Sequence, residues 1–115
     1  MRALSLHGYA SNGAAFTSHK AKALQEHVGS LLALDAIDGP AQLEGGRGKQ
    51  RAWWQFAPAF PMSRVDQPGW WALEAVEYVD AEATIDGLVH TWQEGGYDAL
   101  LGFSQGALCA AMLCA

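Results

Sequence analysis

The sequence predicts an α/β fold in which helices flank a parallel sheet. Three short apolar runs, near residues 2–6, 31–37 and 97–101, are candidate buried strands. Stretches with helical spacing alternate with these runs, and strand–helix–strand units of this kind place the strands in parallel. The 115 residues contain no internal repeat, so we expect residues 1–115 to belong to one domain.

The first strand, "RALSL", stops at the pair His7-Gly8, which predicts a loop. The stretch from about Gly13 to His27 has apolar residues near helical spacing and therefore predicts a helix. Asn12 is its expected cap and Gly29 its expected stop. The second strand, "SLLALDAI", follows this helix and ends at the turn "DGP".

Residues 39 to about 72 differ from the rest of the chain. They hold all four prolines, a "GGRG" stretch and the pairs Trp53-Trp54 and Trp70-Trp71. No helical or strand period persists there, so we expect a long loop. Because exposed tryptophans would leave a large apolar area in water, we expect them to pack over the core or to line a pocket.

Regular structure returns with a helix from Asp80, its expected cap, to the stop at Gly95-Gly96. The final run, "QGALCAAMLCA", predicts a helix that is apolar on every side, which is typical of helices inside larger proteins. No later segment of the sequence covers it. We therefore expect a bare helix face beside an unpaired sheet edge, and this edge is a candidate to pair with another chain.

Composition and charge exclude several function classes. The formal charge of -5 argues against a nucleic acid or an anionic membrane as the main partner. The N-terminus lacks the apolar core of a secretion signal, and the C-terminal apolar run is too short to span a bilayer. Cys109 and Cys114 point to different helix faces, and we interpret both as buried thiols. Together these features predict a cytoplasmic protein.

The segment "GFSQG" carries the strongest chemical signal. Ser104 lies between a predicted strand and a predicted helix, with Gly102 and Gly106 two residues away on either side. A sharp turn at this place needs small neighbours so that the two backbones can approach. Such a turn would expose the hydroxyl at a helix N-terminus, where free N–H groups and the helix dipole favour an oxyanion. Ser104 is therefore the candidate nucleophile.

The loop after the first strand supports the same interpretation. In hydrolases with a serine on such a turn, this loop donates one backbone N–H to the oxyanion and the residue after the serine donates the other. The expected donors are the N–H groups of Tyr9 and Gln105. We expect His7 to stabilise the loop rather than to act as a base.

At this point the sequence resembles the α/β-hydrolase family called the family of serine hydrolases. The resemblance covers nearly the whole chain and is carried, in order, by "LSLHGYASNGAAF", "LDAIDGPAQL", "RAWWQF" and "YDALLGFSQGALCAAML". It implies a partial α/β-hydrolase fold, with residues 1–115 as the N-terminal portion of one domain. It also implies hydrolysis of a small-molecule ester or thioester without a cofactor. Ala41 departs from the family, which often has histidine there.

The resemblance also implies a triad that runs Ser, Asp, His along the chain. All four histidines and every acid precede Ser104 in this sequence. We therefore interpret the chain as a truncated serine hydrolase that is inactive or very weak alone. The alternative is a hydrolase remnant without catalysis that acts as an interaction protein.

The sequence also bears on two further kinds of site, a phosphate-binding loop and a metal site. The stretch "GGRGKQ" suggests a phosphate loop, but Leu43 and Gln50 stand where that motif needs Gly and Ser or Thr. The histidines lack ligand spacing, so we expect no metal site. Asp35 and Asp38 could bind a ligand at the end of the second strand, although such acids are more often solvated loop residues.

Overall fold

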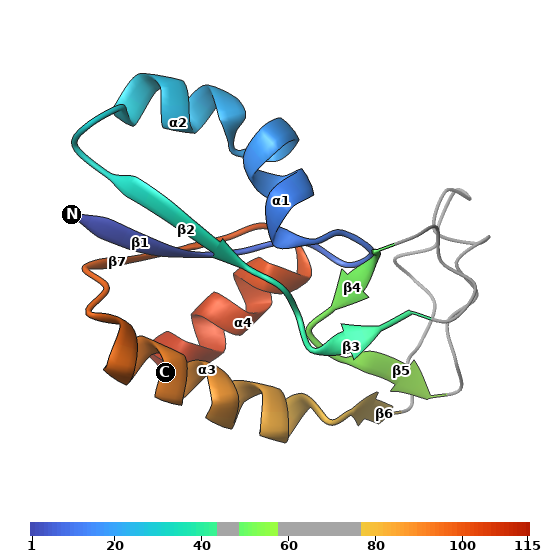
Figure 1. Cartoon of the computed structure of the whole chain (residues 1–115). Helices are drawn as coiled ribbons and strands as arrows, with labels where there is room; N and C mark the ends of the chain where they lie inside the picture. The colour runs from blue at the N-terminus through green and yellow to red at the C-terminus, as the bar shows by residue number, and fades with distance from the viewer. Residues whose placement is uncertain (44–48, 58–76) are drawn as a thin grey trace.

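The computed structural model describes residues 1–43, 49–57 and 77–115 (Figure 1). Its main sheet is parallel, with the strand order β2-β1-β7, which confirms the predicted α/β class. Leu4 lies at the centre of the sheet, where it pairs with Asp35 on one side and with Leu100 on the other. The three strands are β1 (Arg2–Leu6), β2 (Ala33–Ile37) and β7 (Ala99–Gly102).

Two of these strands begin later than the sequence predicted. The expected strand at 31–37 starts at Ala33, because the N–H of Leu31 still donates to the carbonyl of Val28 in the last helical turn, at 2.9 Å. The expected strand at 97–101 starts at Ala99. Leu31 is apolar but 76% exposed, so its hydrophobicity misled the assignment.

The sheet lies between two layers of helix (Figure 1). On one face the predicted helix 13–27 is divided into α1 (Gly13–Ala15), η1 (Phe16–Lys20), which is π-helical, and α2 (Lys22–Val28). In the wide π turn the N–H of Ala21 donates to the carbonyl of Phe16 at 2.8 Å. Asn12 caps α1 through a bond from the Ala15 N–H, as expected, and Gly29 ends α2.

The other face carries α3 (Ala81–Gly95) and α4 (Gln105–Cys114). Gly96 ends α3 in a left-handed conformation, with φ of 63°, as the sequence predicted. The expected cap at Asp80 is wrong. Its φ is 60° and its side chain makes no capping bond, whereas a capping residue needs extended backbone to turn its side chain back onto the helix.

The region expected to be a long loop contains short strands. β3 (Ala41–Gln42) pairs with β4 (Arg51–Ala52), and β5 (Gln55–Ala57) pairs with β6 (Glu77–Val79), both antiparallel. Strands of two or three residues are too short for an alternating pattern to show in the sequence, which explains why they were missed. Trp70-Trp71 lie outside the described residues.

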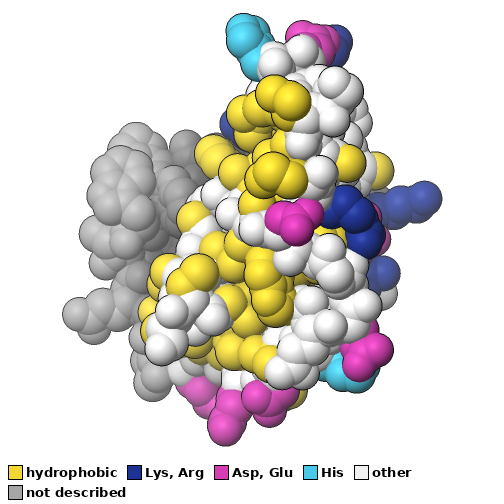
Figure 2. All heavy atoms as spheres, turned by 90° about the vertical axis from the view of Figure 1, so that its left-hand side faces the viewer, with side chains coloured by type: hydrophobic (Ala, Val, Ile, Leu, Met, Phe, Trp, Pro, Cys, Tyr) yellow, Lys and Arg dark blue, Asp and Glu magenta, His cyan; other side chains and the backbone are white. Residues whose placement is uncertain are grey.

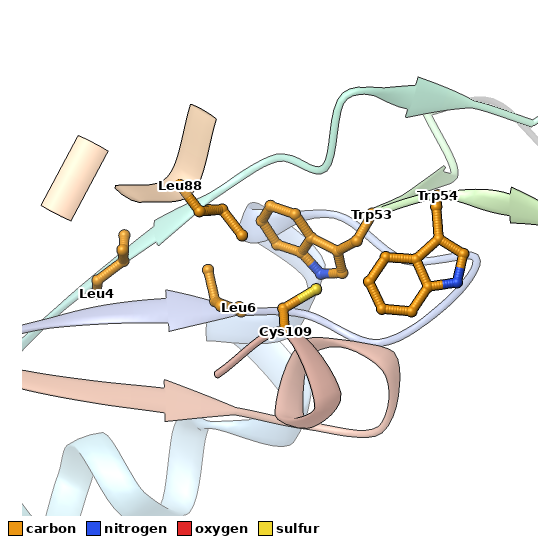
Figure 3. Packing of buried hydrophobic residues seen from close by; sticks show 6 residues of the cluster. All are labelled: Leu4, Leu6, Trp53, Trp54, Leu88 and Cys109. Carbon is orange, nitrogen blue, oxygen red and sulfur yellow. The ribbon is translucent and has the colours of Figure 1, made fainter. Parts of the chain in front are cut away.

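The hydrophobic core forms between the main sheet, α3 and α4 (Figure 3). The prediction that the first tryptophan pair packs over the core is confirmed, because Trp53 and Trp54 are 1% and 2% exposed. The fully packed cluster consists of Leu4, Leu6, Trp53, Trp54, Leu88 and Cys109.

Trp53 is also the centre of a buried set of hydrogen bonds. Its indole N–H donates to the carbonyl of His7, which follows β1, at 2.7 Å. Its backbone N–H donates to Oε1 of Gln105 in α4 at 2.8 Å, and its carbonyl accepts from Oγ1 of Thr84 in α3 at 2.6 Å. Three elements that are distant in sequence are therefore fixed to one residue.

His7 is fully buried and stabilises its loop, as expected. Its Nε2 accepts the N–H of Gly39 at 2.8 Å, so its Nδ1 carries the proton and donates to the carbonyl of Gly8 at 2.7 Å. Burial lowers the pKa of His7 below its ordinary value, and the Gly8 carbonyl and Asp38 oppose this only in part.

One side of the molecule exposes much apolar surface. Figure 2 looks at the side where both termini lie in Figure 1 and shows hydrophobic side chains along the middle of that face. On α4, Leu108 and Met112 are 49% and 43% exposed, as expected for an uncovered helix. Among the described residues no strand pairs with the outer edge of β7.

The two cysteines differ. Cys109 is buried as expected, but Cys114 is exposed because it lies at the end of α4, so the expectation of two buried thiols is half wrong. No helix within the described ranges has both the length and the apolar character needed to cross a bilayer.

Removing the Thr84 hydroxyl should destabilise the fold. Thr84→Val leaves the buried Trp53 carbonyl without its donor, so we expect the free energy of unfolding to fall by about 1–3 kcal/mol in urea melts. Thr91→Val, in the same helix, is the matched control because the Thr91 hydroxyl donates to the carbonyl of Gly87 in its own helix, in an exposed hydrogen bond. Its effect should stay within about 0.5 kcal/mol. Equal losses in both variants would contradict the role given to Thr84.

Stability should fall on mild acidification because of His7. The lowered pKa means that the unfolded chain binds a proton here before the folded chain does. The contribution of His7 is therefore present above its unfolded pKa of about 6.5 and is lost as the pH falls through the folded pKa. Urea melts between pH 7.5 and 5 should show a steeper loss for the native chain than for His7→Gln, by at most about 1.4 kcal/mol per pH unit. His90→Gln, at an exposed position, should leave the native slope unchanged.

Candidate active site

Ser104 occupies a sharp turn between β7 and α4. Its backbone has φ of 55° and ψ of -119°, a conformation that non-glycine residues rarely adopt. Its side chain makes no capping hydrogen bond to α4, and the residue is exposed. Strain of this kind persists only where the surrounding structure holds it, and it clusters at functional sites. The strand–turn–helix geometry is the one expected from "GFSQG".

The two flanking glycines allow this turn to form. A methyl group on Gly102 would collide with the backbone of Gly106 and Ala107 in the first turn of α4. One on Gly106 would collide with the carbonyls of Leu6 and His7 at the end of β1. Glycine is therefore required at both positions by close backbone approach.

The first loop lies directly against the turn. A Cβ atom built on Gly8 would lie 3.3 Å from Cβ of Ser104 and 3.2 Å from Cδ1 of Phe103. The N–H of Phe103 also donates to the carbonyl of Leu6 at 3.1 Å, which ties the turn to the end of β1. Tyr9, the next residue of the loop, is half-buried. The first loop and the N-terminus of α4 thus meet at Ser104, while the donor roles of Tyr9 and Gln105 stay predictions.

The side chain of Gln105 has a function that the sequence did not reveal. It is only 8% exposed, and it accepts the N–H of Trp53 through Oε1 at 2.8 Å while Nε2 donates to the carbonyl of Trp54 at 3.1 Å. The residue after the candidate nucleophile is therefore clamped to the tryptophan segment. The sequence predicted a role only for its backbone N–H, although a polar residue at the start of an otherwise apolar helix is a signal for its side chain.

The first loop is fixed at its far end as well. Ser11 and Arg51 exchange two backbone hydrogen bonds, of 3.2 and 2.6 Å, which join the loop to β4. Ala10, between Tyr9 and Ser11, has a φ of 61°. Because β4 leads directly into Trp53, both strained turns are held by the same segment of chain.

His7 is not available as a base for Ser104. Both of its ring nitrogens are engaged, with Gly39 and with Gly8, and its low pKa reflects the cost of a buried charge. The other three histidines, His19, His27 and His90, are exposed residues of the helices. No histidine or acid follows Ser104 in the sequence.

Other reactive groups near the turn are few. Burial raises the pKa of the Cys109 thiol to about 12, so it stays protonated and does not compete as a nucleophile. The ammonium of Lys20 lies 5.1 Å from the ring centroid of Phe103, on the outer side of the turn. Within the described part of the chain, no three metal-binding side chains come together.

Asp35 and Asp38, in and directly after the second strand, both accept hydrogen bonds from other parts of the fold. Asp35 lies inside β2, where its Oδ2 accepts from Arg2 at 3.1 Å and from the Tyr97 hydroxyl at 2.5 Å. Asp38 accepts the N–H of Gly13 at 2.8 Å, at the start of α1. The expectation of a solvated loop residue is therefore wrong for Asp35, which lies inside β2, and is confirmed for Asp38, which is exposed in the loop after β2 although it binds the Gly13 N–H.

Curated relatives of this chain are named as esterases. The esterase OVCA2 of Danio rerio is 28% identical over 127 aligned positions, covering 100% of this chain and 56% of the relative. An esterase of Anopheles gambiae is 31% identical, covering 99% of this chain and 42% of the relative. The OVCA2 esterase of Xenopus tropicalis is 29% identical, covering 100% and 53%. The chain thus spans about half the length of the curated relatives it matches.

A comparison with models of protein families also indicates a hydrolase. The model of the family described as serine hydrolase (FSH1) matches residues 1–115. That match covers the first loop, the tryptophan segment and the turn at Ser104, which the structure brings together. The chain belongs to the serine hydrolase (FSH1) family.

Proposed function

We propose that this chain carries the nucleophile and the oxyanion site of a serine hydrolase that acts on carboxylic esters or thioesters through an acyl-enzyme. The observation that carries the proposal is the strained, exposed Ser104 at the N-terminus of α4, with the first loop against it. Esterase names among the relatives and the family match support the same reaction class.

In the proposed reaction the Ser104 oxygen attacks the carbonyl carbon of the substrate and gives up its proton to a base. The backbone N–H groups of Tyr9 and Gln105 donate to the resulting oxyanion. The carbonyl re-forms as the bond to the alcohol or thiol leaving group breaks, and the leaving group takes a proton. Water then attacks the ester on Ser104, which releases the acid and restores the hydroxyl.

The base of this reaction is proposed to lie outside the 115 residues. His7 is engaged in the fold, and neither a histidine nor an acid follows Ser104. Relatives about twice as long, and an α4 whose outer face is exposed, support the interpretation of the chain as a partial enzyme. An unassisted serine hydroxyl stays protonated at neutral pH and is a poor nucleophile.

A second candidate function is protein interaction without catalysis. The specific observation in its favour is the unpaired edge of β7, within the described residues, beside the exposed Leu108 and Met112 of α4. Such an edge is a template for strand addition by another chain.

A cytoplasmic location stays a prediction. Cys109 and Cys114 are both free thiols, which supports it.

The activity test compares the chain with a fusion. The 115-residue chain alone should hydrolyse p-nitrophenyl esters barely above background. A chimaera continued after Ala115 with the remaining part of the Danio rerio relative should gain at least about 10³-fold in kcat/KM, since it adds the missing base. Ser104→Ala should abolish that gain. Robust turnover by the unfused chain that Ser104→Ala removes would contradict the proposal of a missing base.

The interaction test uses the same two proteins in sedimentation velocity. If the partial-enzyme interpretation holds, the chain alone should self-associate through its bare face and the chimaera should be less associated. A chain that is monomeric alone and inactive as the chimaera would contradict both candidate functions.

A further inference from the structure

Four aromatic side chains form a continuous series beside the candidate active site, and we name this series the aromatic ladder. Phe56 and Tyr78 are directly opposite each other in the β5–β6 pair, with ring centroids 5.6 Å apart. Trp54 lies two residues before Phe56 and contacts Tyr78 at 5.8 Å, and Tyr9 contacts Phe56 at 5.6 Å. All these separations fall in the range that aromatic pairs prefer.

The ladder begins next to Ser104. Tyr9 follows Gly8, which lies against Ser104, and the N–H of Tyr9 is one of the two proposed oxyanion donors. The ladder then continues through Phe56 to Tyr78. A group attached to a carbonyl held at Ser104 would therefore have aromatic rings beside it on this side.

Exposure differs along the ladder and is greatest at Tyr78. Trp54 is 2% exposed, Tyr9 and Phe56 are half-buried, and Tyr78 is 55% exposed. Trp54 and Phe56 thus support the ring of Tyr78 by direct contact, while much of Tyr78 remains exposed to a ligand. A supported aromatic ring that stays exposed to water is typical of a binding surface.

The charge around the ladder restricts the ligand. A cavity of about 460 Å³ adjoins Tyr78 and is lined by acids, namely Asp80, Glu82 and Asp86. Carboxylates at this end of the ladder disfavour a negatively charged group there. The ligand that fits is therefore flat and carries no negative charge.

We propose that the aromatic ladder binds an aromatic or conjugated acyl group of the ester that carries no negative charge, which makes such esters the preferred substrate class. This inference rests on the proposed function of Ser104, because it places the acyl carbonyl at that residue. Ring stacking on Tyr78 gives the preference over a saturated group of equal size.

The test measures binding rather than turnover, with a matched pair of ketones. The first, 4-phenyl-2-butanone, has an aromatic ring, and the second, 4-cyclohexyl-2-butanone, has the same carbon count with a saturated ring. Each is titrated into the 15N-labelled 115-residue chain, and Kd is read from amide shifts near Ser104. The phenyl ketone should bind about three- to tenfold more tightly than the cyclohexyl ketone.

Variants assign the preference to the ladder. Tyr78→Leu keeps an apolar side chain but removes the ring, so the two Kd values should become equal; Tyr78→Phe should retain the preference. Leu31→Ala, at an exposed position outside the ladder, is the control and should change nothing. Because Tyr78→Leu removes the ring contacts with Trp54 and Phe56, its fold is checked by thermal melt. If it does not fold, the comparison of the two ketones in the native chain still tests the inference.

The outcomes separate this inference from the proposed function. Equal Kd values in the native chain, or a preference that survives Tyr78→Leu, would overturn the inference even if the chimaera is an active esterase. A phenyl preference that is also present in Ser104→Ala and is lost in Tyr78→Leu supports it, since binding needs no nucleophile. If that preference stands and the chimaera has no esterase activity, the proposed function fails alone.

Discussion

The buried hydrogen bonds of Trp53 are the constraint on which the site depends. This residue joins the end of β1, through His7, to α3, through Thr84, and to α4, through Gln105. Each bond is made in a water-free interior, where an unpaired partner would cost about 1–3 kcal/mol. The neighbouring Trp54 differs, because its equally buried indole N–H has no partner among the described residues. The second tryptophan therefore contributes apolar area, and the first fixes the geometry.

The strained turn at Ser104 is maintained by what surrounds it. Its positive φ costs roughly 1–3 kcal/mol. Gly102 and Gly106 pack closely against neighbouring backbone, and this packing keeps the turn in its strained conformation. The side chain of Gln105 adds a second restraint from the opposite direction. If Ser104 is the nucleophile, as we propose, a hydroxyl held in this way needs little reorganisation before it reacts.

The sequence predicted the fold class, three strands and the turn at Ser104, because each depends on local pattern: short apolar runs, flanking glycines and helical spacing. It failed where tertiary contacts decide. Asp35 was expected in solvent but is paired by Arg2 across the sheet, and β5 is too short to show a period before β6 pairs with it. The side chain of Gln105 could not be assigned, since its partners lie 51 and 52 positions earlier in the chain.

This arrangement divides the proposed chemistry between two parts of a polypeptide. Stabilising an oxyanion needs rigid donors, and we propose that the first loop and α4 supply them, since both are held by contacts within the described residues. Transferring a proton needs a titratable group near neutral pH, and His7 cannot serve because the fold uses both of its nitrogens and lowers its pKa. On the proposed function, preorganised binding and proton transfer are therefore separable, and this chain would hold a carbonyl beside Ser104 whether or not a base is present. The aromatic ladder lies in the same part of the polypeptide, so the proposed selectivity for the acyl group would not depend on the base.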